Sequence, residues 1–393
     1  MLSVSTNLCC GCGNCALVCP KGCISLTENE NGFLLPTVNT DSCISCGKCE
    51  KVCPVLDYTA KIDETHTAFA AYAKTPKDRF NGSSGGVFGG AAKHFLKSNG
   101  IVYGAAFDEH LQLKTTKAEN EDELTPLFKS KYLQCDIGSA FIDIRQHLEN
   151  GKKVLYTATP CQIQALKKYL GKTYENLWTI DFVCHGVPSQ KFFDLCREYT
   201  QTKQNIQIEN YQFRAKKKHG STPHYYKMKY RKNEKSKEKT SLYLHSPFYY
   251  GFQKYITLRE SCYHCPFAKS NRPSDITIGD FHAIDKYVAG INRFDGVSTV
   301  VINTEKGATL WKEIQPDFVE HPIDFSVLLE NKELMTGPTP KPKNYDVFWS
   351  NYRALSFKDF AKKHLNGKKE WMKRLYYHLP AFTRKILKKV IGI

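Results

Sequence analysis

Two runs of cysteine near the amino terminus have the spacing of metal ligands. Each reads C-x-x-C-x-x-C-x-x-x-C-P, the first beginning at Cys9 and the second at Cys43. In this doubled pattern each run supplies three sulfurs to one iron–sulfur cubane, and its fourth cysteine reaches across to the other. We therefore predict two 4Fe-4S clusters, one held by Cys9, Cys12, Cys15 and Cys53 and the other by Cys43, Cys46, Cys49 and Cys19.

Zinc is a poor alternative for these two runs. A structural zinc ion takes four ligands, usually in two separated pairs, whereas here the cysteines stand in one doubled register. Two more cysteines of this region, Cys10 and Cys23, fall outside the pattern. By elimination we predict that neither is a ligand and that each packs as a small buried hydrophobe.

A third group of cysteines lies further along the chain. Cys262 and Cys265 form a C-x-x-C-P clip with no second clip near it, so a four-ligand site must take two sulfurs from elsewhere. Cys161 and Cys184 are the natural donors, because each follows a predicted strand. The residues alone favour a third 4Fe-4S cluster on these four cysteines, with zinc or a reactive Cys161 thiol as the alternatives.

The elements that must position these cysteines follow from the order of apolar and polar residues. Residues 1–58 read as one small repeated module with a strand–turn–strand hairpin between its two runs. Beyond it, strands alternate with helices, which is the pattern of an α/β domain. The predicted strands "KKVLYTA" and "LWTIDFV" lead to Cys161 and Cys184, so both thiols stand at carboxyl ends of strands, where such folds gather their sites.

We expect three parts in the chain. These are a ferredoxin-like dicluster domain over residues 1–58, a larger mixed α/β domain over 59–340, and a linker with a basic helical tail over 341–393. Within the second part, alternating aromatic and basic residues from about residue 206 predict a β-rich insertion. Cys135 and Cys196 fall within predicted helices and are assigned to the core.

The formal net charge of +17 is concentrated in residues 214–240 and 360–393. The second stretch has apolar residues at near-helical spacing between its lysines, at Trp371, Leu375, Leu379 and Phe382. We expect this basic amphipathic tail either to lie on an anionic membrane surface or to pack on the protein's own body. No nucleic acid is expected as a partner, because neither stretch comes with a recognised binding module.

The sequence also predicts a compartment. The amino terminus lacks a basic region followed by an apolar stretch, so no secretory signal is predicted. No apolar run approaches the ~20 residues of a membrane helix. Clustered thiols in a reducing compartment bind metal or do redox work more often than they pair. We therefore expect a cytoplasmic protein, with the basic tail as its candidate contact with the inner face of a membrane.

Several segments of the main domain together carry a resemblance: "SSGGVFGGAA", "KSKYLQCDIG", "TPCQIQAL", "DFVCHGVPS" and "CYHCPFAKSNRPSDITIGDF". Over about residues 9–310 the chain resembles the β-subunit family of coenzyme F420-reducing hydrogenases and dehydrogenases, which are iron–sulfur flavoproteins. The resemblance implies a 4Fe-4S cluster next to a bound flavin in the main domain. This matches the third set of cysteines, Cys161, Cys184, Cys262 and Cys265.

The resemblance also implies FAD, which the residues alone do not reveal. No G-x-G-x-x-G fingerprint follows a strand, so a Rossmann-type site is not supported. The segment Ser83, Ser84, Gly85 and Gly86 precedes a predicted helix, where free amides suit phosphate. A tight turn with an N-cap serine is the alternative. Thr159 and Lys131 are further candidates for flavin contact, and nothing in the sequence identifies a pocket for the F420 deazaflavin.

These features predict an iron–sulfur, flavin-dependent oxidoreductase that moves electrons between a ferredoxin-type carrier and a small organic substrate. The alternative is an electron-transfer subunit that serves a partner oxidoreductase and has no substrate site of its own. Similar stand-alone bacterial proteins are associated with surface-polysaccharide genes, which is an implication of the resemblance only. No catalytic residue is assigned. His185, Asp275, Asp280 and His282 are considered for proton transfer, with capping and turn roles as the alternative.

Overall fold

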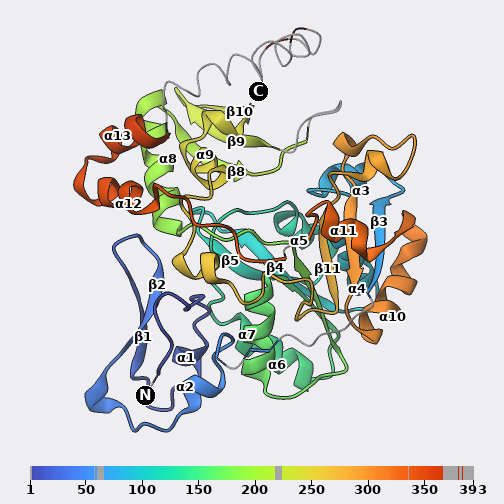
Figure 1. Ribbon diagram of the computed structural model, residues 1–393, viewed down its shortest axis with the longest axis horizontal. Helices are drawn as coiled ribbons and strands as arrows, with labels where there is room; N and C mark the ends of the chain where they lie inside the picture. The colour runs from blue at the N-terminus through green and yellow to red at the C-terminus, as the bar shows by residue number, and fades with distance from the viewer. Residues whose placement is uncertain are drawn as a thin grey trace.

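The computed structural model describes residues 2–56, 58–59, 66–216, 224–334, 336–365, 379 and 383. These residues form an amino-terminal module, a domain built on an eight-stranded sheet, and a region around a smaller three-stranded sheet (Figure 1). Most of the predicted basic tail, Trp371, Leu375 and Phe382 included, lies outside the described residues.

A hairpin and two one-turn helices make up the amino-terminal module. Its elements are α1 (Asn14–Leu17), β1 (Ile24–Glu28), β2 (Leu34–Val38), the 3-10 turn η1 (Thr40–Ser42) and α2 (Lys48–Lys51). The strands β1 and β2 pair antiparallel, as the sequence predicts. The side chain of Asn29 closes their turn by accepting hydrogen bonds from the amides of Asn31 and Phe33, at 3.1 and 2.9 Å.

An eight-stranded mixed sheet forms the centre of the main domain. In spatial order its strands are β13 (Phe318–Ile323), β3 (Thr67–Ala73), β12 (Ser298–Ile302), β11 (Ile276–Asp280), β7 (Leu177–Phe182), β6 (Val154–Ala158), β4 (Ile101–Phe107) and β5 (Leu113–Ala118). The strands β4, β6, β7 and β11 are parallel, and the outer strands pair antiparallel. The carboxyl ends of β6, β7 and β11 therefore lie along one edge, next to Cys161, Cys184 and Asp280.

Helices cover both faces of this sheet because its strands alternate apolar side chains between the two faces. In β4, Val102 packs toward one layer and Tyr103 toward the other. The first layer contains α4 (Val87–Lys97) and α10 (Glu305–Ile314), and the second contains α6 (Ala140–Glu149) and α7 (Pro160–Leu170). The predicted mixed α/β class, preceded by a small ferredoxin-like domain, is confirmed. Shorter helices flank these layers: α3 (Pro76–Asn81), α5 (Glu121–Leu124) and α11 (Phe325–Glu330).

The three-stranded sheet corresponds to the predicted β-rich insertion. Its order is β10-β9-β8, with β8 at Gln207–Gln212, β9 at Tyr225–Lys232 and β10 at Lys235–Leu242. It packs on α8 (Gln190–Gln204) and α9 (Pro247–Gln253) through a core rich in aromatic rings, among them Phe193, Phe213 and Phe248. This core reaches the edge of the large sheet, since Leu113 of β5 belongs to it and Phe107 of β4 packs against it.

The carboxyl-terminal segment is helical and packs on the body of the protein as far as residue 365. α12 (Tyr345–Ala354), α13 (Phe357–Phe360) and the π-helical turn η8 (Ala361–Leu365) lie beside α8 (Figure 1). Trp349 is 1% exposed, and its ring centroid lies 5.9 Å from that of Phe192. The aromatic residues of this segment thus complete a core, and packing on the protein's own body was one of the two arrangements expected for the tail.

One buried arginine joins the amino-terminal module to the main domain. Arg259 is 3% exposed, and its guanidinium donates to the carbonyl of Cys9 at 2.8 Å, to Oε1 of Gln134 at 2.6 Å and to the carbonyl of Leu34. Gly11 lies directly against this contact, since a Cβ there would stand 2.5 Å from Nε2 of Gln134. The loop that carries the first cysteines is therefore held against the body without room for a larger residue.

Replacing Arg259 with leucine is expected to loosen the module from the body. The change leaves buried acceptors without a donor, and each such group costs about 1–3 kcal/mol, so we expect the free energy of unfolding to fall by roughly 3 kcal/mol. Chemical unfolding and limited proteolysis of the anaerobically purified protein measure the change. Arg231→Leu is the control, because that side chain is 55% exposed and pairs with Glu209 on the surface. Equal stability of the two variants would contradict the contact's role.

Candidate metal centres

The cysteines of the amino-terminal module line two separate hollows. One is lined by Cys9, Cys12, Cys15 and Cys53, and we call it the proximal site. The other is lined by Cys19, Cys43, Cys46 and Cys49, and we call it the distal site. Each hollow receives three sulfurs from one cysteine run and one from the other, in the sets that the doubled spacing predicts.

Left-handed glycines shape both hollows. Gly13 and Gly47 occupy equivalent positions in the two runs, between the second and third cysteine, with φ of 77° and 72°. Each is the residue before a one-turn helix and redirects the chain there. A Cβ on Gly47 would meet nothing within 4 Å. Its backbone conformation, not lack of space, therefore requires glycine at this position.

The two hollows differ in their exposure to solvent. Cys9 and Cys53 of the proximal site are buried, whereas Cys46 of the distal site is exposed. The proximal site is tied to the body through the carbonyl of Cys9, which Arg259 binds. The proximal site is thus the inner one, and the distal site faces outward.

The four main-domain cysteines line one further hollow, which we call the main-domain site. Cys161 stands in the first turn of α7, directly after β6, and Cys184 follows the neighbouring parallel strand β7. Cys262 lies in the 3-10 turn η4 (Glu260–His264), and Cys265 follows it. The structure thus brings together the four cysteines that the sequence grouped.

Gly186 allows the two cysteine-bearing segments of this site to approach each other. It has a φ of 120°, and a Cβ there would stand 2.9 Å from Cβ of Cys262 and 2.7 Å from Cδ1 of Leu258. Any side chain would therefore push Cys184 and Cys262 apart. Gly186 is visible in the sequence segment "CHGVPS". The residue that it lies against, Cys262, is far along the chain, so the sequence alone does not show why glycine is needed.

Burial keeps the thiols of the main-domain site protonated in the absence of a metal. It raises the pKa of Cys184 to about 12 and that of Cys265 to about 11. Arg272 also lines the hollow, and its Nε lies 3.5 Å from the buried carboxylate of Asp181. A metal centre that binds here must displace the thiol protons, and it would gain a nearby positive charge that suits an anionic thiolate cluster.

The spacing of the ligand groups distinguishes a cluster from a single ion. Within the described residues, no group of three or more His, Cys, Asp or Glu side chains converges closely enough to hold one metal ion. A cubane binds each cysteine through a different iron, so its sulfurs stand further apart than those around one zinc ion. Each of the three hollows has the four cysteines assigned to it in its lining, and four thiols are the donor set that such a cluster takes.

Cys135 and Cys196 were both predicted to lie in helices, and only Cys196 does. Cys196 is in α8 and is 2% exposed, as expected of a core residue. Cys135 lies in the loop before α6 and lines the main-domain hollow, where its thiol is 3.5 Å from Oγ1 of Thr115. The predicted helix begins only at Ala140, because Gly138 takes a positive φ of 49° just before it.

The two cysteines left over from the ferredoxin pattern both contact candidate ligands. Sγ of Cys23 lies 3.3 Å from Sγ of Cys19 at the distal site. The Cys10 thiol is within hydrogen-bonding reach of Cys12 and of Cys161. The sequence analysis set Cys10 and Cys23 aside because they fall outside the spacing pattern, and so it missed these contacts. The contact of Cys10 with Cys161 joins the module to the main domain, which spacing within one run does not reveal.

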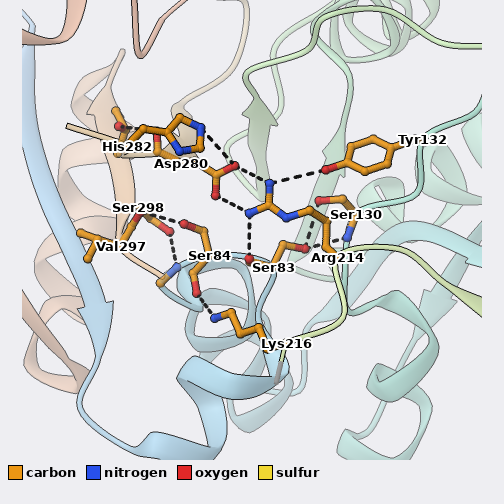
Figure 2. A network of polar contacts seen from close by, with 12 residues as sticks. Ser83, Ser84, Ser130, Tyr132, Arg214, Lys216, Asp280, His282, Val297 and Ser298 are labelled. Carbon is orange, nitrogen blue, oxygen red and sulfur yellow. Dashed lines mark hydrogen bonds and ion pairs between the residues drawn. The ribbon is translucent and has the colours of Figure 1, made fainter. Parts of the chain in front are cut away.

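The Ser83–Gly86 segment is a loop that is held by its own side chains (Figure 2). Oγ of Ser83 accepts a hydrogen bond from the amide of Ser130 at 2.7 Å, and Oγ of Ser84 donates to the carbonyl of Val297 at 2.7 Å. The N-cap of α4 is Gly86, with a φ of 93° and no side-chain cap, so the N-cap serine alternative is wrong. The loop is a tight turn that leaves a helix N-terminus without a side-chain acceptor.

Positive charge gathers around this loop. Arg214 is 8% exposed and forms two 2.6 Å bonds with the carboxylate of Asp280, while its Nη2 donates to the carbonyl of Ser83 at 3.0 Å (Figure 2). Lys216 donates to the carbonyl of Ser84, and Lys129 donates to that of Gly82. Burial, together with the neighbouring cations, lowers the pKa of both lysines to about 7. The three cationic side chains Arg214, Lys216 and Lys129 thus surround the loop, and the carboxylate of Asp280 pairs with the first of them.

The other two residues considered for flavin contact lie elsewhere. Lys131 donates to the carbonyls of Pro126 and Phe128, each at 2.8 Å, and so is engaged within its own segment. Thr159 lines the main-domain hollow, and its Oγ1 lies 3.2 Å from Sγ of Cys161. The four loop residues, Lys131 and Thr159 therefore do not form one continuous set.

Of the residues considered for proton transfer, Asp275 has a structural role, whereas His282 is exposed and His185 is stacked on an aromatic ring. The carboxylate of Asp275 accepts bonds from Thr179 and Thr304, at 2.7 and 2.8 Å, and ties β7 to α10 as a buried structural group. Nε2 of the exposed His282 lies 3.9 Å from the Asp280 carboxylate. His185 stacks on the ring of Tyr255 at a centroid distance of 5.7 Å, and burial lowers its pKa.

Comparison with known proteins identifies the two larger parts of the chain. Residues 151–322 match the family model for the carboxyl-terminal part of the coenzyme F420 hydrogenase/dehydrogenase beta subunit. The main domain is therefore similar to this family over those residues. Residues 8–56 match the "4Fe-4S dicluster domain". The family-level resemblance of the sequence segments is therefore confirmed, and the chain is an iron–sulfur electron-transfer protein related to F420-dependent oxidoreductases.

Two relatives illustrate this likeness. The coenzyme F420-dependent sulfite reductase of Methanocaldococcus jannaschii is 28% identical over 330 residues, which is 79% of this chain and 47% of that protein. The chain thus spans about half the length of this curated relative. A solved structure of the F420-reducing [NiFe] hydrogenase complex from Methanosarcina barkeri aligns with a TM-score of 0.44 and 16% identity, over 67% of this chain and 86% of that one. Among the described residues of this chain, no helix has the length and apolarity to span a bilayer.

Asp280→Asn is expected to lower the free energy of unfolding by about 3–5 kcal/mol at pH 7, because it leaves Arg214 buried without its counter-charge. Burial alone would raise the pKa of Asp280, but the Arg214 guanidinium overrides burial and holds that pKa well below its usual range. The stabilisation is fully present above the unfolded pKa of about 3.9 and is lost as pH falls below it toward the folded value.

Chemical unfolding at pH 7 and at pH 3 measures this contribution, and the difference between wild type and Asp280→Asn should shrink at the lower pH. Asp285→Asn is the control, because Asp285 is 45% exposed and lies 3.7 Å from an exposed Arg293. A loss at pH 7 that is no larger for Asp280→Asn than for the control would contradict the buried ion pair's role.

Proposed function

We propose that this chain is an iron–sulfur, flavin-dependent oxidoreductase with three 4Fe-4S clusters and FAD, which moves electrons between a ferredoxin-type carrier and an organic substrate. The observation that carries the proposal is the main-domain hollow, whose lining brings together Cys161, Cys184, Cys262 and Cys265 and which adjoins the proximal site. When bound, the clusters supply one-electron transfer, and the flavin supplies the exchange between one- and two-electron chemistry.

The third cluster is supported by the donor set of the main-domain site. Cys161, Cys184, Cys262 and Cys265 come from three separate segments, and no sequence constraint other than a shared ligand asks for thiols at all four positions. Among the described residues, no three His, Cys, Asp or Glu side chains stand as a group that could hold a single metal ion. A cubane takes four thiolates at wider spacing.

The order of the three sites supports a relay. The proximal and main-domain hollows share Cys10, Gly11 and Cys12 as a common wall. The distal hollow shares no lining residue with the main-domain one, and its Cys46 is exposed. Electrons would therefore exchange with a soluble carrier at the distal site and pass through the proximal site to the main domain.

The proposed FAD is supported by the charge at the Ser83–Gly86 loop. Lys129, Arg214 and Lys216 leave more positive charge there than Asp280 balances. The amide end of α4 opens at the same loop. An anionic group such as a dinucleotide phosphate would restore the balance and would accept from these amides.

A second function is favoured by the family description. The matched family is that of a beta subunit, and the curated relative is about twice as long as the matched part. The chain would then be an electron-transfer subunit that serves a partner oxidoreductase and binds no substrate. Substrates from surface-polysaccharide metabolism, which the resemblance implies, are the first to assay, since turnover by the isolated chain separates the two functions.

Anaerobically purified protein is expected to contain about twelve irons per chain, four for each cubane, together with one FAD. Cys161→Ala and Cys262→Ala should each lose about four irons while the electron paramagnetic resonance (EPR) signals of the ferredoxin-type pair persist. Cys196→Ala is the matched control, because that thiol is buried in α8 outside every hollow. About eight irons and no flavin in the wild-type protein would refute the main-domain assignment.

Binding of FAD is expected to weaken as pH rises from 6 to 9. Lys129 and Lys216 have pKa values of about 7 in the free protein, so both lose their charge across this range and with it their attraction for phosphate. Titration of flavin-free protein, followed by quenching of FAD fluorescence, measures the affinity. Lys129→Met should weaken binding at pH 6 and flatten its pH dependence, whereas Lys117→Met, on the exposed β5, should not. An affinity that does not change with pH would exclude this role of the lysines.

A further inference from the structure

Cys10 lies between ligands of two different sites. It lines both the proximal and the main-domain hollow. Its thiol is within hydrogen-bonding reach of Cys12, a proximal ligand, and of Cys161, a main-domain ligand. The backbone on either side of it is fixed, because Arg259 binds the carbonyl of Cys9 and Gln134 donates to that of Gly11. Cys10 is thus held in place from both directions.

This position does not suit a fifth ligand. In a cubane each cysteine binds its own iron, so two ligand sulfurs stand further apart than two hydrogen-bonded sulfurs. A thiol within hydrogen-bonding reach of Cys161 cannot share its cubane unless one of them moves. Cys10 is also adjacent in sequence to Cys9, which the spacing pattern assigns to the proximal cluster. What remains for Cys10 is an S–H group between two thiolates.

We propose that Cys10 is a positioning residue that donates its one S–H hydrogen bond to the ligand thiolates of the proximal and main-domain clusters and thereby raises the reduction potentials of both. The proposal rests on the proposed third cluster. Reduction adds one electron, whose charge is partly carried by the sulfur ligands, and a hydrogen bond to sulfur stabilises that charge. Cys10 keeps its proton throughout, and no bond to its sulfur forms or breaks.

Because Cys10 has a single proton, it can serve only one thiolate at a time. The hydrogen bond would turn toward Cys12 or Cys161, whichever belongs to the more reduced cluster. Each reduced state would then be stabilised in turn as an electron passes between the two sites. A serine at this position keeps a donor, whereas an alanine removes it.

Cys23 provides an independent comparison at the distal site. Its Sγ lies 3.3 Å from that of Cys19, and it lines the distal hollow but neither of the other two. It belongs to the same module and is likewise outside the ligand pattern. The same physical argument applies, so Cys23 should affect only the distal cluster.

The test is a redox titration of the anaerobic full-length protein, followed by EPR, for wild type, Cys10→Ala, Cys10→Ser and Cys23→Ala. We expect Cys10→Ala to lower two of the three midpoint potentials with no loss of iron. A tenfold change in the equilibrium constant of each one-electron reduction corresponds to about 59 mV. Cys10→Ser should retain most of the wild-type values and also serves if the alanine variant does not fold. Cys23→Ala should lower only the remaining potential.

Three outcomes would overturn the proposal. Loss of one cluster's iron from Cys10→Ala would make Cys10 a ligand. Unchanged potentials in Cys10→Ala would leave it without influence, and a shift of all three would indicate a general structural effect. If the wild-type protein holds only two clusters, the proposed function fails by its iron content. In that case the contact with Cys12 is still tested, by the potential of the proximal cluster alone.

Discussion

The proposed relay depends on the contact that holds the first cysteine loop against the main domain. Arg259 binds the carbonyls of Cys9 and Leu34, and Gly11 leaves no gap between that loop and Gln134. Electron transfer between centres requires that they be close, and this contact is what gives the proximal and main-domain hollows a common wall. Two further contacts support the same join: Nδ2 of Asn14 donates to the carbonyl of Ala165 at 2.7 Å, and Oγ of Ser189 donates to the carbonyl of Asn31 at 2.8 Å.

Two separate parts of the fold form the main-domain site. Parallel pairing of β6 and β7 brings Cys161 and Cys184 to the same edge of the sheet, which is the usual location for sites in α/β folds. The clip at Cys262 and Cys265 then closes the site from a segment outside the sheet. The Ser83–Gly86 loop, which does not line this hollow, has an excess of positive charge around it, which is costly in a free protein and favourable once an anion binds. Both features are arrangements that a bound cofactor would stabilise.

The sequence predicted what is encoded locally. The eight-cysteine spacing, the hairpin between the runs and the strand–helix alternation all depend on neighbours a few residues apart, and they agree with the observed elements. The third set of thiols was reached because strand ends carry positional meaning in this class of fold. Aromatic alternation likewise indicated the three-stranded sheet.

The remaining features depend on contacts between distant segments, which spacing does not reveal. The Arg259 join, the cations around the loop at Ser83 and the two contacts of Cys10 each bring together segments far apart in the sequence. Cys135 was assigned to a helix that begins only after Gly138. The sequence left open whether the tail lies on a membrane or packs on the body, because a local pattern of basic and apolar residues does not distinguish the two. As far as residue 365, its aromatic rings complete the core on α8.

The central claim is that a cubane in the main-domain site adjoins the proximal one. An anomalous difference map measured at the iron absorption edge, from crystals of the anaerobic protein, tests it most directly. We predict three iron peaks, one of them among Cys161, Cys184, Cys262 and Cys265, with the shared wall at Cys10 between it and the proximal peak. Two peaks confined to the amino-terminal module, with no iron among these four thiols, would contradict it.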